Sequence, residues 1–295
     1  MTARRGGMTV VKTVAEATRL AAEAARADLV TGLVPTMGAL HDGHRALIRR
    51  ARDECGWVAV SIFVNPTQFA EGEDLGKYPR TFEKDLAACE SEGADLVFAP
   101  AEGEMYLADH TTWVEVGELS VSMEGLSRPS HFRGVTTVVA KLLNVFRPAR
   151  AYFGQKDLQQ VVIVERMARD LNMPVEIIRV PTVREPDGLA MSSRNVYLSG
   201  PEREAALSLR RGLADFERMV AEGERDANVL MEAVAEPVIA EPLATLDYVS
   251  IVDARTLRDV SRVRGEVAAA LAVWIGDTRL IDNAIVEVAD PAEEK

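Results

Sequence analysis

The feature that most constrains the fold is a regular alternation of short apolar runs with longer segments of helical periodicity, from Thr9 to about Pro181. The apolar runs are almost continuously hydrophobic, which is typical of strands buried on both faces of a parallel sheet. The segments between them are long enough to be crossover helices. We therefore predict an α/β fold with a Rossmann-like, doubly wound parallel sheet.

The individual elements follow from the same pattern. We predict strands over Leu29–Val34, Trp57–Val64, Asp95–Ala99, Thr112–Val116, Arg150–Phe153 and Val175–Val180. We predict helices over Val14–Ala27, His44–Glu54, Thr81–Glu92, Val135–Phe146 and Leu158–Leu171. Thr81 is placed to N-cap the third of these helices, and Gly93 is placed to end it.

From about Arg184 the pattern changes. Two long, charged amphipathic helices are predicted over Pro201–Glu222 and Ala227–Ala240, followed by strands over Leu246–Val252, Glu266–Trp274 and Arg279–Val288. This order favours a smaller C-terminal α+β domain. We expect a Rossmann-like domain at residues 1–183 and the α+β domain at residues 184–295.

Charge and composition exclude several classes of protein. A net charge of −12 over 295 residues repels nucleic acid and anionic membranes, so we expect neither as a partner. The apolar runs are too short to cross a bilayer, and no apolar signal-peptide core follows Met1–Gly7. Cys55 and Cys89 lack metal or redox spacing and fit a reducing compartment, so we expect a cytoplasmic protein.

The motif VPTMGALHDGH (34–44) carries the strongest chemical signal. It follows the first predicted strand and opens a helix, which is where open α/β sheets bind ligands. Gly38 and Gly43 let the backbone approach a ligand, and the helix start offers unpaired N–H groups. His41 and His44 lie three residues apart, so both rings lie on one face and can donate to a phosphate.

Two other interpretations of this motif are surface histidines at a turn and a zinc-binding pair. The chain has four histidines, and two of them fall within this motif, which argues against a chance surface pair. A zinc pair lacks a third His or Cys nearby and the i, i+4 spacing usual on helices. The H-x-G-H pattern resembles the signature of the nucleotidyltransferase superfamily, which identifies a superfamily and not a reaction.

Further segments follow later strands. Asn65 and Gln68 are neutral amides that suit recognition of hydroxyl and carboxylate oxygens, although a polar turn is the simpler alternative. A similar arrangement follows a later strand, where Gly154 precedes a cation, Lys156, and a predicted helix that contains Gln160. The ammonium of Lys156 suits a phosphate, although an ordinary surface lysine is the alternative.

Two loops add cations. Met191-Ser192-Ser193-Arg194 offers two hydroxyls and a guanidinium near the domain junction, which suits a phosphate clamp on a closing lid. In isolation this is a weak signal, because Ser-Ser-Arg is common in loops. The segment 128–134 brings a third histidine and more cations to one loop.

Together these motifs resemble the pantothenate synthetase (pantoate–β-alanine ligase) family over nearly the whole chain. The matching segments are VPTMGALHDGH (34–44), VSIFVNPTQF (60–69), YPRTFEKD (78–85), RPSHFRGV (128–135), YFGQKDLQQ (152–160), DGLAMSSRN (187–195) and GDTRLIDN (276–283). The resemblance implies an enzyme that uses ATP and Mg²⁺ to adenylate (R)-pantoate, releases pyrophosphate and lets β-alanine displace AMP. The product would be pantothenate, for coenzyme A biosynthesis. It also implies a homodimer formed through the N-terminal domain.

The resemblance further implies the roles of individual residues. The catalytic residues would be His44, usually given the proton-donor role, with His41, Lys156 and Arg194. ATP would be bound by Met37, Gly38, Ala39, Leu40, His41, Asp42, Gly43, His44, Gly154, Gln155, Lys156, Asp157, Val183, Met191, Ser192, Ser193 and Arg194, with Val183 matching a backbone contact to adenine. Pantoate would contact Gln68 and Gln160, and β-alanine would contact Gln68.

Asn65, Tyr78 and Arg128 would have secondary roles, and no residue is expected to bind a metal. The N-terminal domain would bind nucleotide and pantoate, and the C-terminal domain would act as a lid. Gln155 departs from the acidic residue that the family often carries.

The proposed chemistry fits these residue types. A hydroxy-acid carboxylate has a pKa of about 4 and is ionised at neutral pH, so the first step needs no general base. Cations and positioned donors then carry the catalysis. The second step requires a neutral amine, and either water or His44 can take its proton.

Two rival functions make different predictions. A nucleotidyltransferase that passes AMP to a phosphate acceptor would need a basic pocket where this chain has Gln68 and Gln160. A nucleotide-sensing module would bind ATP without releasing pyrophosphate.

Overall fold

The computed structural model describes residues 7–70 and 72–289, and they form two compact units. Unit 1 contains the chain up to Gly154 together with Ile163–Pro181, and unit 2 contains Gln155–Val162 together with the chain from Thr182 onward. A short segment from the middle of the sequence thus packs with the C-terminal part. The domain boundary expected at residues 183 and 184 remains a prediction. Within the described residues, no helix has both the length and the apolar character needed to span a bilayer.

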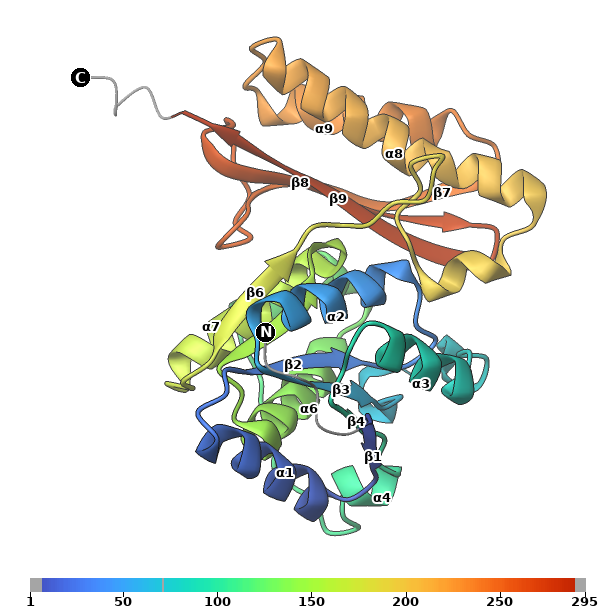
Figure 1. Cartoon of the computed structure of the whole chain (residues 1–295). Helices are drawn as coiled ribbons and strands as arrows, with labels where there is room; N and C mark the ends of the chain where they lie inside the picture. The colour runs from blue at the N-terminus through green and yellow to red at the C-terminus, as the bar shows by residue number, and fades with distance from the viewer. Residues whose placement is uncertain (1–6, 71, 290–295) are drawn as a thin grey trace. The chain divides into compact units, whose positions relative to one another are not determined.

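Unit 1 is built on a six-stranded, entirely parallel sheet with the order β1-β4-β3-β2-β5-β6 (Figure 1). Its strands are β1 (Thr9–Val11), β2 (Thr31–Thr36), β3 (Trp57–Ile62), β4 (Leu96–Phe98), β5 (Arg150–Gly154) and β6 (Glu176–Val180). The predicted α/β fold class is therefore confirmed.

The helices between these strands cover both faces of the sheet. They are α1 (Val14–Arg26), α2 (Asp42–Glu54), α3 (Phe82–Ser91), α4 (Glu102–Met105), α5 (Glu124–Ser127), α6 (His131–Phe146) and α7 (Leu158–Asp170). Ile48 and Ala51 of α2 and Cys89 of α3 are buried in one apolar cluster with strand residues. The right-handed crossover rule places α1 and α6 on the opposite face, since their connections run the other way along the sheet.

One predicted strand is absent, and one short strand was not predicted. Thr112–Val116 is not a strand, because α6 side chains satisfy its backbone: the Val114 N–H donates to Thr137 Oγ1 at 3.0 Å, and the Val114 carbonyl accepts from Thr136 Oγ1 at 2.6 Å. β1 was not predicted from the sequence; it is only three residues long and pairs with β4 at the sheet edge.

The chain reverses its direction across the sheet between β2 and β5, which are neighbours. From β2 the connection leads to β3 on one side, and from β5 it leads to β6 on the other. Thr36 at the end of β2 lies opposite Ile62 at the end of β3, so the loops that follow begin at the same edge. Such a switch point at the carboxyl ends of strands is where doubly wound sheets bind ligands.

Unit 2 contains an antiparallel sheet, β7-β8-β9, with two helices along one face (Figure 1). Its elements are α8 (Gly200–Ala221), α9 (Ala227–Ile239), β7 (Ala244–Asp253), β8 (Gly265–Ile275) and β9 (Thr278–Val288). Leu213 and Phe216 of α8 and Val234 of α9 pack against Leu271 of β8 in one buried cluster. The predicted smaller α+β part is therefore confirmed, with each element within a few residues of its predicted position.

Candidate active site

The turn between β2 and α2 is held by the buried carboxylate of Asp85, which lies on α3. Asp85 Oδ2 accepts a hydrogen bond from the Ala39 N–H at 3.0 Å, and Oδ1 accepts one from the Leu40 N–H at 2.8 Å. Gly38 and Ala39 have φ angles of +81° and +51°, and successive N–H groups in such a turn can converge on one anion. A Cβ at Gly38 would lie 3.0 Å from Asp85 Oδ2, so both conformation and space require glycine here.

Thr81 serves the same carboxylate. Its hydroxyl donates to Asp85 Oδ1 at 3.1 Å, and no side-chain hydrogen bond caps α3. The predicted side-chain cap is therefore wrong, although Thr81 does occupy the N-cap position. Asp85 accepts three hydrogen bonds in all, which stabilises a buried carboxylate.

The two histidines of the motif form the N-terminal cap of α2. His41 Nδ1 accepts from the Gly43 N–H at 3.1 Å, and His44 Nδ1 accepts from the His41 N–H at 3.3 Å. The ring centroids are 4.1 Å apart. A ring nitrogen that accepts carries no hydrogen, so in the neutral form each ring carries its hydrogen on Nε2. Both rings are thus set to donate through Nε2.

Five backbone N–H groups of this turn already have partners. Besides the four N–H groups just described, that of Gly38 donates to Thr36 Oγ1 at 3.2 Å. The expectation that the turn offers unpaired N–H groups to a phosphate is wrong for these five groups. The histidine rings add donors to a turn in which these five N–H groups are already used.

Gln68 is buried, and a chain of hydrogen bonds orients its side-chain amide. The Gly134 carbonyl can only accept, so Asn65 must direct its Nδ2 toward it, at 3.1 Å. The same nitrogen donates to Gln68 Oε1 at 3.1 Å, which leaves Gln68 Nε2 directed at Met37 Sδ, at 2.9 Å. A thioether is a weak acceptor, so a carboxylate or hydroxyl oxygen would be a better partner for this amide nitrogen.

Close packing keeps this arrangement in place. Asn65 Oδ1 accepts from the hydroxyls of Thr67 and Tyr106, each at 3.0 Å. A Cβ at Gly134 would lie 2.4 Å from the Thr67 carbonyl oxygen, so no larger residue fits between α6 and the turn η1 (Pro66–Gln68). The amide orientation therefore depends on a glycine of the RPSHFRGV motif.

Two of the three expected cations of segment 128–134, Arg128 and His131, offer no net charge, and the third, Arg133, lies over the Trp113 ring at 5.1 Å. Arg128 forms a two-pronged ion pair with Glu73, with both distances 2.7 Å. The His131 Nδ1 donates to the Gln68 carbonyl oxygen at 2.9 Å, since a carbonyl only accepts. Burial, and next the positive charge of Arg128, lower the pKa of His131 to about 4, so its ring is uncharged at neutral pH. Tyr78, another expected secondary residue, is buried edge-to-face against Phe69.

The other expected residues follow the end of β5. Gly154 ends that strand, and a Cβ there would meet no atom within 4 Å, so the protein itself leaves space beside the chain. Lys156 lies in the turn η4 (Gln155–Asp157), and Gln160 is the third residue of α7. Both side chains are partly exposed.

The loop that carries Met191–Arg194 is tied to the chain entering unit 2. The Met191 N–H donates to the Val183 carbonyl at 3.0 Å, and that carbonyl can accept a second hydrogen bond. Ser192 Oγ accepts from the Arg194 N–H at 3.2 Å and caps the turn η5 (Ser193–Tyr197).

The structure thus places the expected residues in two groups, one in each unit. The group in unit 1 consists of Met37, Gly38, Ala39, Leu40, His41, Asp42, Gly43, His44, Asn65, Gln68, Tyr78, Arg128 and Gly154; the group in unit 2 consists of Gln155, Lys156, Asp157, Gln160, Val183, Met191, Ser192, Ser193 and Arg194. The part each residue plays in binding or catalysis remains a prediction.

Three residues that hold these groups were missed by the sequence analysis. Asp85 and Gly134 act as described above, and Asn283 contacts the turn η4. All three lie in motifs that carried the family resemblance but received no role. Membership of such a motif was the one signal that could have found them.

No group of three or more His, Cys, Asp or Glu side chains in residues 7–70 and 72–289 is arranged to hold a metal ion.

Comparison with known proteins shows the family of this chain. The family model described as pantoate-beta-alanine ligase matches residues 9–285. The pantothenate synthetase of Heliobacterium modesticaldum is 53% identical over 281 residues, which cover 95% of this chain and 100% of that protein. The pantothenate synthetase of Moorella thermoacetica is 51% identical over 283 residues, covering 96% of this chain and all of the relative.

Solved structures give the same result. The crystal structure of pantothenate synthetase from Thermus thermophilus superposes with a TM-score of 0.88 at 45% identity, covering 96% of this chain and 100% of that one. That of pantoate-beta-alanine ligase from Francisella tularensis has a TM-score of 0.78 at 33% identity, with 95% and 98% covered. With a family match over most of its length and relatives above half identity, this chain belongs to the pantoate–β-alanine ligase family.

Proposed function

We propose that this enzyme condenses (R)-pantoate with β-alanine, using ATP, through a pantoyl-adenylate. A carboxylate oxygen of pantoate attacks the α-phosphorus, and the bond from that phosphorus to pyrophosphate breaks. The β-alanine amine then attacks the acyl carbon, and AMP leaves. The product, pantothenate, is a precursor of coenzyme A. The Francisella tularensis relative was solved with β,γ-ATP and β-alanine, which supports these two substrates here.

The observation that carries this proposal is the neutral surrounding of Gln68. Arg128 is committed to Glu73, and the His131 ring is uncharged, so the groups beside the Gln68 amide offer no net positive charge. A rival nucleotidyltransferase would need cations here for a phosphate acceptor. A hydroxy acid, with one carboxylate and two hydroxyls, is matched by amide donors instead.

In this mechanism the histidine rings and Lys156 stabilise the charge that develops on the phosphates. His41 and His44 donate through Nε2, and Lys156 and Arg194 contribute cations. Preorganised donors of this kind each contribute roughly 2.7–4 kcal/mol to a transition state. Gln68 and Gln160 hold pantoate so that its carboxylate lies in line with the leaving group, which can contribute roughly 7–11 kcal/mol.

We propose that Mg²⁺ arrives bound to the ATP phosphates and not in a protein cage. The described residues gather no cluster of carboxylates for it. Mg²⁺ commonly keeps several water ligands and is held through substrate phosphates, where it neutralises their charge.

We also propose a homodimer formed through the N-terminal part. The segment 107–126 exposes large apolar side chains: Leu107 is 66%, Val121 is 67% and Leu126 is 75% exposed. Such side chains are typical of surfaces that a second subunit covers. Light scattering should give twice the chain mass, and Leu126→Glu should reduce it toward that of one chain.

A cytoplasmic location is part of the proposal. Cys55 and Cys89 are free and buried, and unpaired thiols are the usual state in a reducing compartment.

A pyrophosphate-exchange experiment tests the reaction. Labelled pyrophosphate should enter ATP when pantoate is present without β-alanine, because adenylation is reversible and precedes the amine. AMP should accumulate over many turnovers only when both substrates are present.

Each rival gives a different outcome. Pyrophosphate exchange that needs neither pantoate nor β-alanine would favour the nucleotidyltransferase. Transfer of AMP to a phosphate compound would favour it as well. ATP binding without exchange or AMP release would favour a nucleotide-sensing module.

A further inference from the structure

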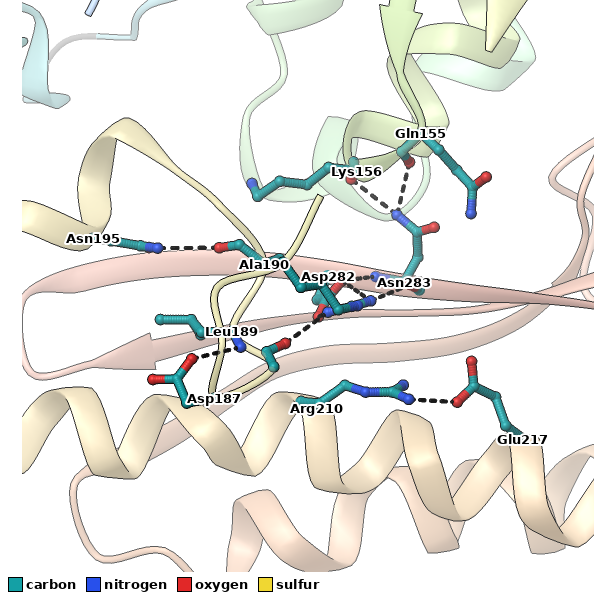
Figure 2. A network of polar contacts seen from close by, with 12 residues as sticks. Gln155, Lys156, Asp187, Leu189, Ala190, Asn195, Arg210, Glu217, Asp282 and Asn283 are labelled. Atoms are coloured by element: carbon teal, nitrogen blue, oxygen red, sulfur yellow. Dashed lines mark hydrogen bonds and ion pairs between the residues drawn. The ribbon is translucent and has the colours of Figure 1, made fainter. Parts of the chain in front are cut away.

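Two consecutive residues of β9, Asp282 and Asn283, bind two separate loops of unit 2. Asn283 Nδ2 donates to the carbonyl oxygens of Gln155 and Lys156, each at 2.9 Å (Figure 2). Asp282 forms an ion pair with Arg184 through both carboxylate oxygens, at 2.6 and 3.1 Å. Consecutive residues of a strand point to opposite faces, so these two neighbouring residues of β9 can contact two different loops.

The two carbonyl oxygens are the hydrogen-bond partners of the Asn283 side-chain amide among the described residues. Carbonyl oxygens only accept, so the nitrogen of the amide must face them, and both of its hydrogens are used. Its Oδ1 is buried and has no hydrogen-bond partner among the described residues. Asn283 lies opposite Ala270 of β8, and both residues are buried. A buried acceptor without a partner lowers stability, so fold stability alone does not explain an amide at this position.

The ion pair of Asp282 extends the same connection to the second loop. Arg184 Nη1 also donates to the Gly188 carbonyl at 3.2 Å, and Arg184 pairs with Ala190 across a short antiparallel bridge. The Asn283 N–H donates to Asp282 Oδ1 at 2.8 Å. The backbone of β9 is therefore joined to the loop that leads into Met191–Arg194.

Lys156 has no comparable support for its side chain. Its ammonium forms no ion pair with any residue that the structure describes, and the side chain extends from the turn away from Asn283 (Figure 2). A lysine side chain is long and flexible. The position from which its ammonium acts is therefore set by the backbone of η4, which Asn283 holds.

We propose that Asn283 is a positioning residue for ATP: by binding the carbonyl oxygens of Gln155 and Lys156, it fixes the turn from which the Lys156 ammonium contacts the phosphates. This inference rests on the proposed function, since it assumes that Lys156 contacts the nucleotide. Asp282 and Arg184 keep the strand and the second loop in register with that turn.

The first experiment measures the kinetic constants of Asn283→Ala and Asn283→Asp. The alanine removes both donors, and the aspartate keeps the shape but places negative oxygens against two carbonyls. We expect kcat/KM for ATP to fall about tenfold in Asn283→Ala and further in Asn283→Asp. The pantoate KM should change less than about twofold, because the contact acts on the nucleotide side. If Asn283→Asp does not fold, Asn283→Ala alone decides the question.

A double-mutant cycle separates positioning from a structural role. If Asn283 acts through Lys156, then adding Asn283→Ala to Lys156→Ala should lower kcat/KM for ATP by less than about twofold more. Additive losses would overturn the proposal. An equal rise in the ATP and pantoate KM values of the single variant would also overturn it, because that pattern indicates general loosening of the unit.

Asp247→Asn is the matched control. Asp247 pairs with Arg279 at 2.6 Å on β7 and β9 of the same sheet, away from η4 in sequence and pairing. It should lower the melting temperature as Asn283→Ala does but leave the ATP KM unchanged.

If the proposed function is wrong, the outcome differs from that expected if only the role of Asn283 is wrong. A wild-type chain without pantoate-dependent pyrophosphate exchange would refute the function itself. The ATP dissociation constant, measured by calorimetry, would still decide the inference: an equal constant in wild type and Asn283→Ala overturns it, and a weaker one in the variant supports it.

Discussion

The two groups of expected site residues are held in opposite ways. In unit 1 the turn before α2 is fixed through its N–H groups, which donate to the Asp85 carboxylate. In unit 2 the turn η4 is fixed through its carbonyl groups, which accept from the Asn283 amide. In both cases a buried side chain takes up the backbone groups, and partly exposed side chains are left to meet the ligand.

The difference teaches how much of each turn is preorganised. In unit 1 the groups proposed to act, the histidine rings, are themselves bound to the backbone through Nδ1, so their orientation is fixed. In unit 2 only the backbone of η4 is fixed, and Lys156 extends from it on a flexible stem. We infer that unit 1 supplies precise geometry, and that Lys156 supplies charge with less exact placement.

The largest expected effect comes from removing the acting side chains. His44→Ala and Lys156→Ala should each lower kcat by about 10²–10³-fold, roughly 2.7–4 kcal/mol, because each removes a donor to developing charge. Pyrophosphate release at saturating substrates measures this. Lys84→Ala, at an exposed position of α3, is the control and should be close to wild type. A normal rate in Lys156→Ala would leave Arg194 as the one catalytic cation expected in unit 2 and would contradict the part given to the turn η4.

The second effect is a pH dependence of stability that belongs to unit 1, which contains all four histidines. Burial lowers the pKa of His131 from 6.5 to about 4, so the unfolded chain binds more protons than the native one between these values. The stabilisation is complete above pH 6.5 and is lost as the pH falls toward 4, by up to about 3 kcal/mol.

Urea unfolding of the wild type and of His131→Gln from pH 7 to pH 4 measures this effect. The variant should be less stable at pH 7 and should show a shallower decline with acid. Parallel curves for the two proteins would contradict a neutral, buried His131.

A third effect concerns the close packing that orients Gln68. Gly134→Ala places a Cβ 2.4 Å from the Thr67 carbonyl and should lower the free energy of unfolding by about 1–3 kcal/mol. It should also raise the pantoate KM. Gly103→Ala is the control, because its Cβ would meet no atom within 4 Å. Equal melting temperatures for both variants would contradict the packing argument.

The smallest effect is a single lost contact. Gln160→Ala should raise the pantoate KM by up to about tenfold, the value of one hydrogen bond, with little change in the ATP KM. Steady-state kinetics with each substrate varied in turn measure it. A raised ATP KM with an unchanged pantoate KM would assign Gln160 to the nucleotide instead.

The sequence predicted the fold well because the pattern of buried strands is local. Every predicted helix appears, and so does every predicted strand except Thr112–Val116, whose backbone is satisfied by Thr136 and Thr137. Those two threonines lie on a helix more than twenty residues away, and no local pattern reports such a contact. The same reason explains why Asp85 received no role: its partners, Ala39 and Leu40, are more than forty residues distant.

The chemistry of individual residues was harder to predict than their presence. Segment 128–134 was expected to add cations, but Glu73 pairs with Arg128 and burial leaves the His131 ring uncharged. The glycine turn was expected to offer N–H groups, but Asp85 and the histidine rings accept their hydrogen bonds. Residue type indicates which hydrogen bonds and charges a side chain can offer. Its neighbours in the fold decide which of these remain available to a ligand.

The contact between Asn283 and the turn η4 joins parts of the chain that are synthesised at different times. The two ends of this contact are 127 residues apart in the chain. At roughly 5–20 residues per second, Asn283 is translated about 6–25 seconds after Lys156. The Rossmann-like sheet can form in that interval, while the lysine turn still lacks its support. If Asn283 positions this turn as proposed, a nascent chain reaches full efficiency with ATP only when β9 is added.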